Sequence, residues 1–471
     1  MSKSKVLLFN APIVLEKKDV LEMESIYPRI SIASLAAYIL QNNINVSIID
    51  PQASDLSPED VKDRVRKLNP NFVGISAFTE EIHDANYTAE LVKQIDPNIT
   101  TVIGGPHSSA MPIETLKEFK FFDIAVFGEG EQTLVDIVSE KELKAIKGIA
   151  YRFGKEVKLN EKRSLITNLD SLPFPAWQLY NLDRYRGKSL SSGFGKKDGK
   201  LELQVESARG CPFNCIFCYR IAGRMIRFKS PQRVVDEVER NVNEFRATKI
   251  HFVEGTFGVN KDLAIETCNE IIRRKLNKKI TWSTGGRVDV VTEELLSKMK
   301  EAGCEYIGFG VESGVPELLK IMGKNTTLDQ IVNAFKLCKK IKIKSEAEFI
   351  IGHPFENEET VLKTIEFAKN LEANHATFAI MVPFPGTTVR EMARDGVGGL
   401  KILSNDWRIY GKQIGGSLEL EILPLKKLIK LQAKAYKTFY FTPKRLISFL
   451  RRMSIDRLKI GLKRFLVDYD E

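Results

Sequence analysis

The stretch ARGCPFNCIFCYR, residues 208–220, places Cys211, Cys215 and Cys218 within eight residues. It follows closely on residues 201–206, a segment of alternating apolar and polar residues with the length of a β-strand. Three thiolates in this CxxxCxxC spacing can ligate one iron–sulfur cluster that is held by a single loop.

Two other interpretations of the triplet are a zinc site that lacks one ligand and a set of buried thiols without a metal. Zinc would need a fourth Cys or His at usable spacing, and the neighbouring sequence offers none. Three unprotected thiols in one polar loop would be open to oxidation. The sequence therefore favours a cluster. Cys268, Cys304 and Cys338 stand apart on helices or at a strand entrance, and we expect them to pack in the core.

Strand and helix patterns alternate on both sides of this loop. From residue 201 onward, six strand-like segments are separated by helical segments, which predicts a partial (β/α)6 TIM-type barrel with its chemistry at the carboxyl ends of the strands. Before the loop, five strand-like segments alternate with helices up to residue 139. That alternation predicts an α/β fold with a doubly wound, Rossmann-like parallel sheet, whose ligand lies across the carboxyl ends of its strands.

The predicted domains follow from these alternations. They are a Rossmann-like domain (1–139), a connector (140–200) with a hairpin at 148–159, the barrel (201–390), and a basic helical C-terminal region (391–471).

Charge and composition narrow the class of protein. The chain has 471 residues and a net charge of +10, and residues 424–471 alone hold 13 basic and 4 acidic side chains. The basic excess is thus a property of the tail, and the rest of the surface gives no sign of nucleic-acid binding. No uncharged run reaches the length of a membrane span, and the six cysteines are too few for a secreted disulfide framework. We expect a cytoplasmic protein.

The triplet followed by an aromatic residue, Tyr219, on a partial barrel resembles the radical S-adenosylmethionine (radical SAM) superfamily. This resemblance implies a [4Fe-4S] cluster on the three cysteines, with S-adenosylmethionine bound at the fourth iron. It also implies one-electron cleavage of that molecule to a 5'-deoxyadenosyl radical, with the electron supplied by an external flavodoxin- or ferredoxin-type donor.

The resemblance continues through later motifs up to about residue 388. FVEGTF, WSTGGRVD, FGVESG and FIIGHP follow the second to fifth barrel strands. Relatives bind S-adenosylmethionine at such positions, which implies this role for Tyr219, Glu254, Ser283, Arg287, Glu312 and Gly352. His353 is either a substrate contact or a loop residue that is hydrogen-bonded to the backbone.

The first domain resembles the cobalamin-binding domain of a large branch of this superfamily, similar to class B methyltransferases and anaerobic Mg-protoporphyrin cyclases. The motifs GISAFT, GGPH and FGEGE imply cobalamin contacts at Ser76, Thr79, Gly104, Gly105, His107, Gly128 and Glu129. The DxHxxG signature of a lower-axial histidine is absent, so we expect base-off cobalamin. Residues 1–210 contain no cysteine, which excludes methylthiotransferases with a second, N-terminal cluster.

The resemblance implies methyl transfer from cobalamin to an unactivated carbon of a small-molecule or lipid substrate. The alternatives are a cobalamin-dependent radical cyclase, rearrangement or oxidation, and a non-catalytic iron–sulfur or cobalamin sensor.

The tail, residues 425–465, reads as amphipathic helices. Either its apolar face caps the barrel, or its basic residues bind an anionic membrane surface. The second interpretation assigns the membrane-facing role to Lys444, Arg445, Arg451, Arg452, Lys459, Lys463 and Arg464.

Overall fold

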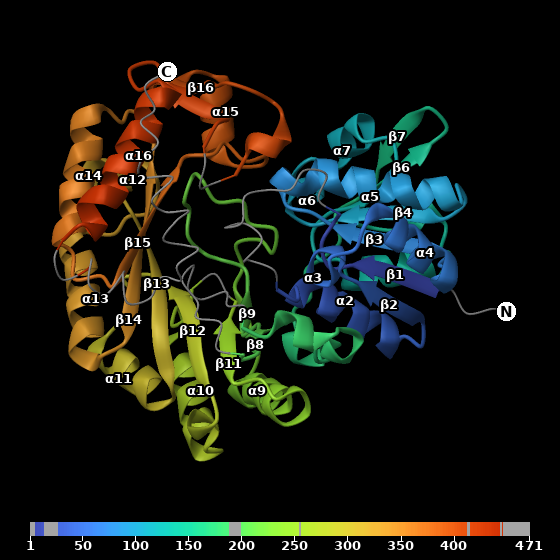
Figure 1. Ribbon diagram of the computed structural model, residues 1–471, viewed down its shortest axis with the longest axis horizontal. Helices are drawn as coiled ribbons and strands as arrows, with labels where there is room; N and C mark the ends of the chain where they lie inside the picture. The colour runs from blue at the N-terminus through green and yellow to red at the C-terminus, as the bar shows by residue number, and fades with distance from the viewer. Residues whose placement is uncertain are drawn as a thin grey trace.

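The computed structural model describes residues 5–13, 27–187, 199–253, 256–411, 415–442 and 445. They form two α/β units, each built on its own sheet of mainly parallel strands. The N-terminal unit lies at the right of Figure 1 and the barrel-like unit at the left. The predicted fold class is confirmed for both.

The first sheet has the strand order β2-β1-β3-β4-β5-β6-β7. Its first five strands pair in parallel, and the order reverses at β1 and β3, as in doubly wound folds. The strands are β1 (Lys5–Phe9), β2 (Asn45–Ile49), β3 (Phe72–Ser76), β4 (Thr100–Gly104), β5 (Ile124–Val126), β6 (Ile149–Phe153) and β7 (Glu156–Leu159).

Helices cover both faces of this sheet because its strands are apolar on both sides. In β1, Leu7 and Phe9 belong to one buried cluster, whereas Val6 and Leu8 belong to another. The helices are α2 (Ile30–Gln41), α3 (Pro51–Ser54), α4 (Pro58–Leu68), α5 (Ile82–Ile95), α6 (Pro106–Ala110), α7 (Pro112–Glu118) and α8 (Glu131–Val138). Helix α4 begins directly after Ser57, which forms a capping box with Asp60.

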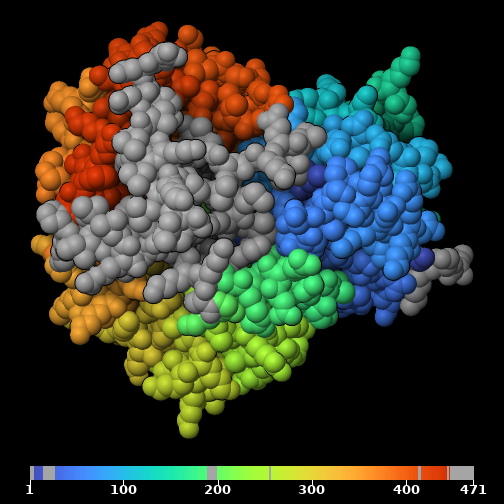
Figure 2. Space-filling model, viewed as in Figure 1, coloured from blue at the N-terminus to red at the C-terminus, as the bar shows by residue number. Residues whose placement is uncertain are grey.

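The hairpin expected within the connector is present as β6 and β7. It pairs antiparallel with β5, so the first sheet extends beyond residue 139. Residues 160–187 of the connector pack between the two units: Trp177 is fully buried, and the amide of Ala176 donates to the carbonyl of Ala33. Figure 2 shows this green segment beside the blue first domain and above the yellow-green part of the barrel unit.

The second sheet has the order β15-β14-β13-β12-β11-β8, and all of its pairs are parallel. Within the described ranges no pairing joins β8 to β15, as expected of a partial barrel. Its strands are β8 (Glu202–Val205), β11 (Lys249–Phe252), β12 (Thr281–Gly286), β13 (Cys304–Glu312), β14 (Lys344–Ile351) and β15 (His375–Ile380). The helices are α9 (Pro231–Phe245), α10 (Lys261–Arg273), α11 (Glu293–Glu301), α12 (Pro316–Ile321), α13 (Leu328–Ile341) and α14 (Glu358–Asn370).

A C-terminal region follows the barrel and touches both units. It contains α15 (Thr388–Arg394), β16 (Leu400–Ile402), β17 (Leu418–Leu420) and α16 (Leu425–Tyr440). Trp407 and Tyr410, between β16 and β17, are buried in a core cluster of the first domain. The C-terminal region, which the sequence analysis related only to the barrel, therefore also contributes to the core of the first domain.

Helix α16 packs on β15, as the capping interpretation of the tail expects. Arg445, one of the residues considered for membrane contact, donates instead to the carbonyls of Lys369 and Leu371 and stacks on Phe439. The other six basic residues considered for that contact lie outside the described residues. None of the described helices combines the length and apolar character that a membrane crossing requires.

Candidate active site

The cysteine loop lies between two short paired strands, β9 (Ala208–Arg209) and β10 (Arg227–Phe228), just beyond the carboxyl end of β8. Its backbone is bonded to two neighbours. The amide of Ile216 donates to the carbonyl of Met322, and the amide of Val389 donates to the carbonyl of Ile216, both at 3.0 Å. The loop is thereby fixed over the open end of the barrel, where the sequence placed it.

Only these three cysteines are accessible among the six. Cys211 and Cys215 are half-buried and Cys218 is exposed, whereas Cys268, Cys304 and Cys338 are buried, as predicted. Burial raises the pKa of Cys268 and of Cys338 to about 12. In the described part of the chain, no three Cys, His, Asp or Glu side chains already converge as metal ligands. The fit to a cluster therefore rests on the chemistry and access of the three thiols.

Charged side chains surround the half-buried Cys215. Burial raises the pKa of its thiol, and the nearby cations Lys324 and Arg287 oppose that rise. The Arg287 guanidinium carbon lies 3.6 Å from the centre of the Phe213 ring, so a predicted S-adenosylmethionine residue stacks directly on the cysteine loop. Its Nη2 also donates to the carbonyl of Lys324 at 2.8 Å.

Glu312 lies in the same cluster of charges. Lys324 Nζ is 2.9 Å from Glu312 Oε1, and both side chains are buried. Glu312 has a φ of +71° at the end of β13, where the pairing register with β14 shifts. A side chain at Gly310 would put its Cβ 2.4 Å from Glu312 Oε1 and 2.7 Å from Lys324 Nζ, so only glycine leaves room for this ion pair.

Two further predicted S-adenosylmethionine residues lie within β12 and directly after β14. Ser283 is buried on β12, 2.9 Å from His251 Nδ1, and burial lowers the pKa of His251 to about 4. The Gly352 amide donates to Glu356, whose pKa burial raises. Glu254 lies outside the described residues.

His353 is buried beside Gly352. Its Nε2 lies 3.4 Å from the backbone carbonyl of Glu312, the kind of contact that the loop interpretation expects. Its Nδ1 and Glu356 Oε1 have no hydrogen-bond partner in the described part of the chain. The turn after β14 therefore holds two buried polar atoms, His353 Nδ1 and Glu356 Oε1, that can still form hydrogen bonds next to Gly352.

Tyr219 brings the two units together. Gly386, in the loop after β15, has a φ of +74° and lies flat against the Tyr219 ring. A Cβ at residue 386 would come within 2.6 Å of that ring and 3.2 Å of the Cβ of Ala110 in α6. The cysteine loop, the last barrel loop and the carboxyl end of α6, the helix that begins within GGPH, thus meet at one place.

Five of the predicted cobalamin residues gather at the carboxyl ends of β3 and β4. They are Ser76, Thr79, Gly104, Gly105 and His107.

Ser76, Gly104 and Gly105 are partly accessible, but Thr79 and His107 are buried. His107 Nδ1 lies 3.4 Å from the Thr79 hydroxyl, and the ring packs edge-on against Trp407. Burial, with His83 and Arg390 nearby, lowers the pKa of His107 to about 4, so the imidazole is neutral and enclosed.

The FGEGE segment divides into two kinds of residue. Gly128 is partly accessible, and its amide donates to the hydroxyl of Ser109 at 3.2 Å. Glu129, in contrast, binds Arg227 and Arg209. The Glu129 carboxylate therefore forms ion pairs within the protein and does not join the residues at the carboxyl ends of β3 and β4.

Sequence reasoning missed Lys324, Phe213 and Trp407. Lys324 is one lysine among many, and only the fold brings it to Cys215. A single sequence carries no signal that would distinguish it.

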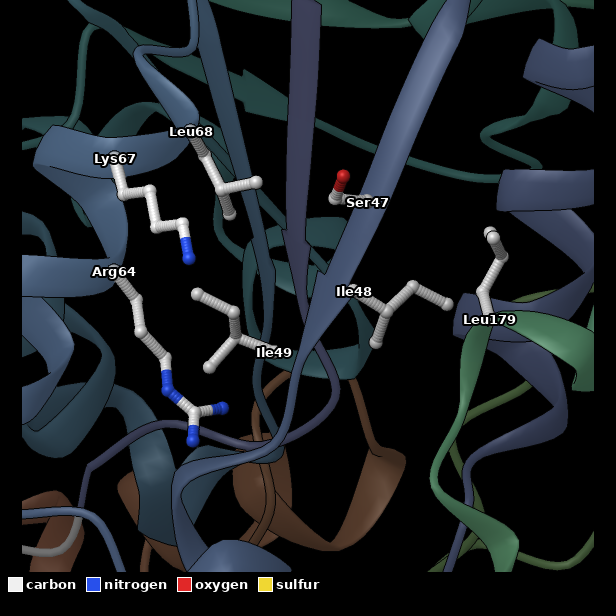
Figure 3. A pocket seen from close by; sticks show the side chains of 7 residues that line it. All are labelled: Ser47, Ile48, Ile49, Arg64, Lys67, Leu68 and Leu179. Carbon is white, nitrogen blue, oxygen red and sulfur yellow. The ribbon is translucent and has the colours of Figure 1, made fainter.

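A pocket on the outer edge of the first sheet is unrelated to these residues. Figure 3 shows Arg64 and Lys67 of α4 projecting beside Ile49 of edge strand β2. None of its lining residues is a predicted cofactor contact.

Comparison with known proteins agrees with this arrangement. The B12 binding domain family matches residues 17–138, and the radical SAM superfamily matches residues 205–368. An uncharacterized methyltransferase of Pyrococcus horikoshii is 36% identical over 426 residues, which cover 89% of each chain. The chain belongs to the cobalamin-binding branch of the radical SAM superfamily.

Two further likenesses lie within the same branch. The anaerobic magnesium-protoporphyrin IX monomethyl ester cyclase of Cereibacter sphaeroides is 31% identical over 359 residues, which cover 74% of this chain and 57% of the cyclase. The solved radical S-adenosylmethionine methyltransferase TsrM from Kitasatospora setae superposes with a TM-score of 0.72 at 17% identity, covering 94% of this chain and 90% of TsrM. The second likeness is one of fold.

Membership in this branch makes the chain a radical SAM enzyme, so the sensor alternative is wrong. Its cofactors are a [4Fe-4S] cluster, S-adenosylmethionine and cobalamin, as the resemblance implied. Radical SAM enzymes require an external reductant.

Proposed function

We propose that this cobalamin-dependent radical SAM enzyme methylates an unactivated carbon. The observation that carries the proposal is the meeting of Tyr219, Gly386 and Ala110, because it brings the cysteine loop beside α6, the helix that begins within the GGPH segment of the first domain. When bound, the cluster supplies the electron that splits S-adenosylmethionine, and cobalamin supplies the methyl group. The methyltransferase relative from Pyrococcus horikoshii, aligned over 89% of its length, supports methyl transfer.

In this proposal, Cys211, Cys215 and Cys218 hold the cluster and leave one iron for S-adenosylmethionine. Arg287 and Lys324 lie beside Cys215. Their positive charge would lie near the anionic cluster and near the carboxylate of S-adenosylmethionine. Glu312 ends β13, Gly352 follows β14 and Ser283 lies within β12, so the three are on neighbouring strands along which the rest of S-adenosylmethionine would extend. Glu254 remains a prediction.

On the first domain we propose that Ser76, Gly104, Gly105 and Gly128 contact the corrin and its side chains. Thr79 and His107 shape this edge from beneath, since both are buried. A neutral His107 enclosed by Trp407 is not placed to ligate cobalt, which agrees with base-off binding.

A radical cyclization is the second candidate, because the cyclase of Cereibacter sphaeroides is 31% identical. One labelling experiment separates the two. The reconstituted enzyme is incubated with dithionite, methyl-deuterated S-adenosylmethionine and a metabolite extract. Methylation predicts a product one labelled methyl group heavier than its precursor, whereas cyclization predicts an altered compound without the label.

We further propose an electron donor, a cellular location and a substrate class for the enzyme. A small flavodoxin- or ferredoxin-type donor suits a cluster loop whose Cys218 is exposed. A reducing, cytoplasmic setting suits three thiols that must stay reduced to bind iron. For the substrate we retain a small molecule or a lipid.

A further inference from the structure

The carboxylate of Glu129 joins the two units of the enzyme. Glu129 Oε1 lies 2.8 Å from Arg227 Nη1 and 3.2 Å from Arg209 Nη1, and Oε2 accepts from the Ile166 amide at 2.7 Å. One side chain of the first domain thereby binds the connector and two residues of the barrel unit.

Both arginines lie at the ends of the cysteine loop. Arg209 is two residues before Cys211, and Arg227 is nine residues after Cys218. They stand opposite each other on the paired strands β9 and β10. Arg227 also donates to the carbonyl of Ala222 within the loop. The residues that define where the loop begins and ends are thus the ones that Glu129 holds.

Two more carboxylates complete the network. Arg209 Nη2 lies 2.7 Å from Glu131 Oε1, and its Nε lies 2.8 Å from Glu206 Oε2. The Glu129 side chain is 7% exposed and that of Arg227 is 4% exposed. Such enclosed ions depend on one another, because removal of one partner leaves the other charged and without solvent.

We propose that Glu129 is a positioning residue that fixes the cysteine loop against the first domain through Arg209 and Arg227. The joint sets where the cluster lies relative to the cobalamin domain. The consequence for methyl transfer rests on the proposed function, whereas the joint itself does not. This assignment replaces the cobalamin contact that the sequence implied for Glu129.

The test uses the full-length chain without added cofactors. Glu129→Gln keeps an acceptor for the Ile166 amide but removes the charge that binds the two arginines. Asp136→Asn is the matched control, because Asp136 is also buried in the first domain, on α8, and pairs with Arg163 and Lys141 without touching the loop.

Hydrogen–deuterium exchange with mass spectrometry is the primary measurement. We expect peptides that cover residues 208–228 to exchange several-fold faster in Glu129→Gln and at the wild-type rate in Asp136→Asn. Glu129→Asp, which keeps the charge on a shorter side chain, should give an intermediate rate, and it serves alone if Glu129→Gln does not fold. Unchanged exchange in the Glu129 variants, or equal acceleration in Asp136→Asn, would overturn the proposal.

A second measurement probes the loaded protein. Dipolar broadening between the reduced cluster and cob(II)alamin, seen by electron paramagnetic resonance, should become more heterogeneous in Glu129→Gln than in Asp136→Asn. If exchange changes as expected and no methylated product is found even for wild type, the joint stands and the proposed reaction falls.

Discussion

At the residue scale, the enzyme keeps its reactive thiols and its structural thiols strictly apart. Cys211, Cys215 and Cys218 share one accessible loop, whereas Cys268 is buried in α10. Burial keeps the Cys268 thiol protonated, with a pKa of about 12, so it has no thiolate to offer a metal.

Substitution should therefore separate the two sets. Cys211→Ala, Cys215→Ala and Cys218→Ala should each abolish the broad iron–sulfur absorbance after anaerobic reconstitution, while Cys268→Ala retains it. Chemical analysis of iron and sulfide, together with the spectra, gives the number of clusters bound per chain. Wild-type cluster content in Cys215→Ala would remove the basis of the site.

The buried pair of Lys324 and Glu312 offers a second prediction. Lys324→Met leaves the Glu312 carboxylate enclosed without a counter-ion, which should destabilise the barrel unit by about 3–5 kcal/mol. The double variant Lys324→Met/Glu312→Gln removes both charges and should recover most of that loss. Denaturant unfolding of the four proteins completes the cycle, and additive losses in the double variant would contradict a direct pair.

His107 makes a prediction about pH. Its pKa is lowered to about 4 from an ordinary value of 6.5, so between these values the unfolded chain binds a proton that the folded chain does not. Stability should fall as the pH drops from about 6.5 to 4, with a slope of up to about 1.4 kcal/mol per pH unit from this group.

His107→Phe should keep the aromatic contact with Trp407 and reduce that slope, as measured by urea unfolding across the same pH range. His251, whose pKa burial also lowers to about 4, continues to contribute in both proteins. Identical slopes in wild type and variant would show that His107 is not the enclosed neutral group described.

At the scale of elements, α16 closes an edge that an incomplete barrel leaves open. The hydroxyl of Tyr436 accepts from the Phe378 amide, and that of Tyr440 accepts from the Ala376 amide. The amide of Gln432 donates to the Phe378 carbonyl. Side chains of a helix thus take the place of a seventh strand along β15.

Removing these hydroxyls tests that role. Tyr436→Phe and Tyr440→Phe should each cost about 1 kcal/mol, because the strand amides lose their partners while the ring packing remains. Lys434→Ala, on the exposed side of the same helix, is the control and should leave the melting temperature unchanged. An equal decrease in the melting temperature of Lys434→Ala would contradict the role of these hydroxyls along β15.

The same elements show what sequence can and cannot predict. The alternation of strand and helix patterns was enough to predict both sheets, since those signals are local. It was not enough for Trp407 or for the partners of α16, because each is defined by a contact with a distant segment. FGEGE illustrates the limit most clearly, since its position at a strand end suggested a ligand and its actual partners, Arg209 and Arg227, lie beyond the connector.

At the scale of the whole molecule, the two sheets carry separate cofactors that must cooperate. The C-terminal region supports this arrangement by packing α16 on the barrel and Trp407 on the first domain. Trp407 also donates to Glu118 at 3.0 Å, which ties the C-terminal region to α7. This region therefore holds the first domain in addition to the Glu129 joint.

The central claim is that this chain combines S-adenosylmethionine cleavage with methyl transfer through cobalamin. The most direct measurement is anaerobic incubation of the reconstituted enzyme with dithionite, cobalamin and methyl-deuterated S-adenosylmethionine, followed by mass spectrometry of the nucleosides and the cobalamin. The account predicts both 5'-deoxyadenosine and deuterated methylcobalamin in wild type, and it predicts loss of 5'-deoxyadenosine in Cys215→Ala. Cobalamin that stays unlabelled while 5'-deoxyadenosine accumulates would contradict it.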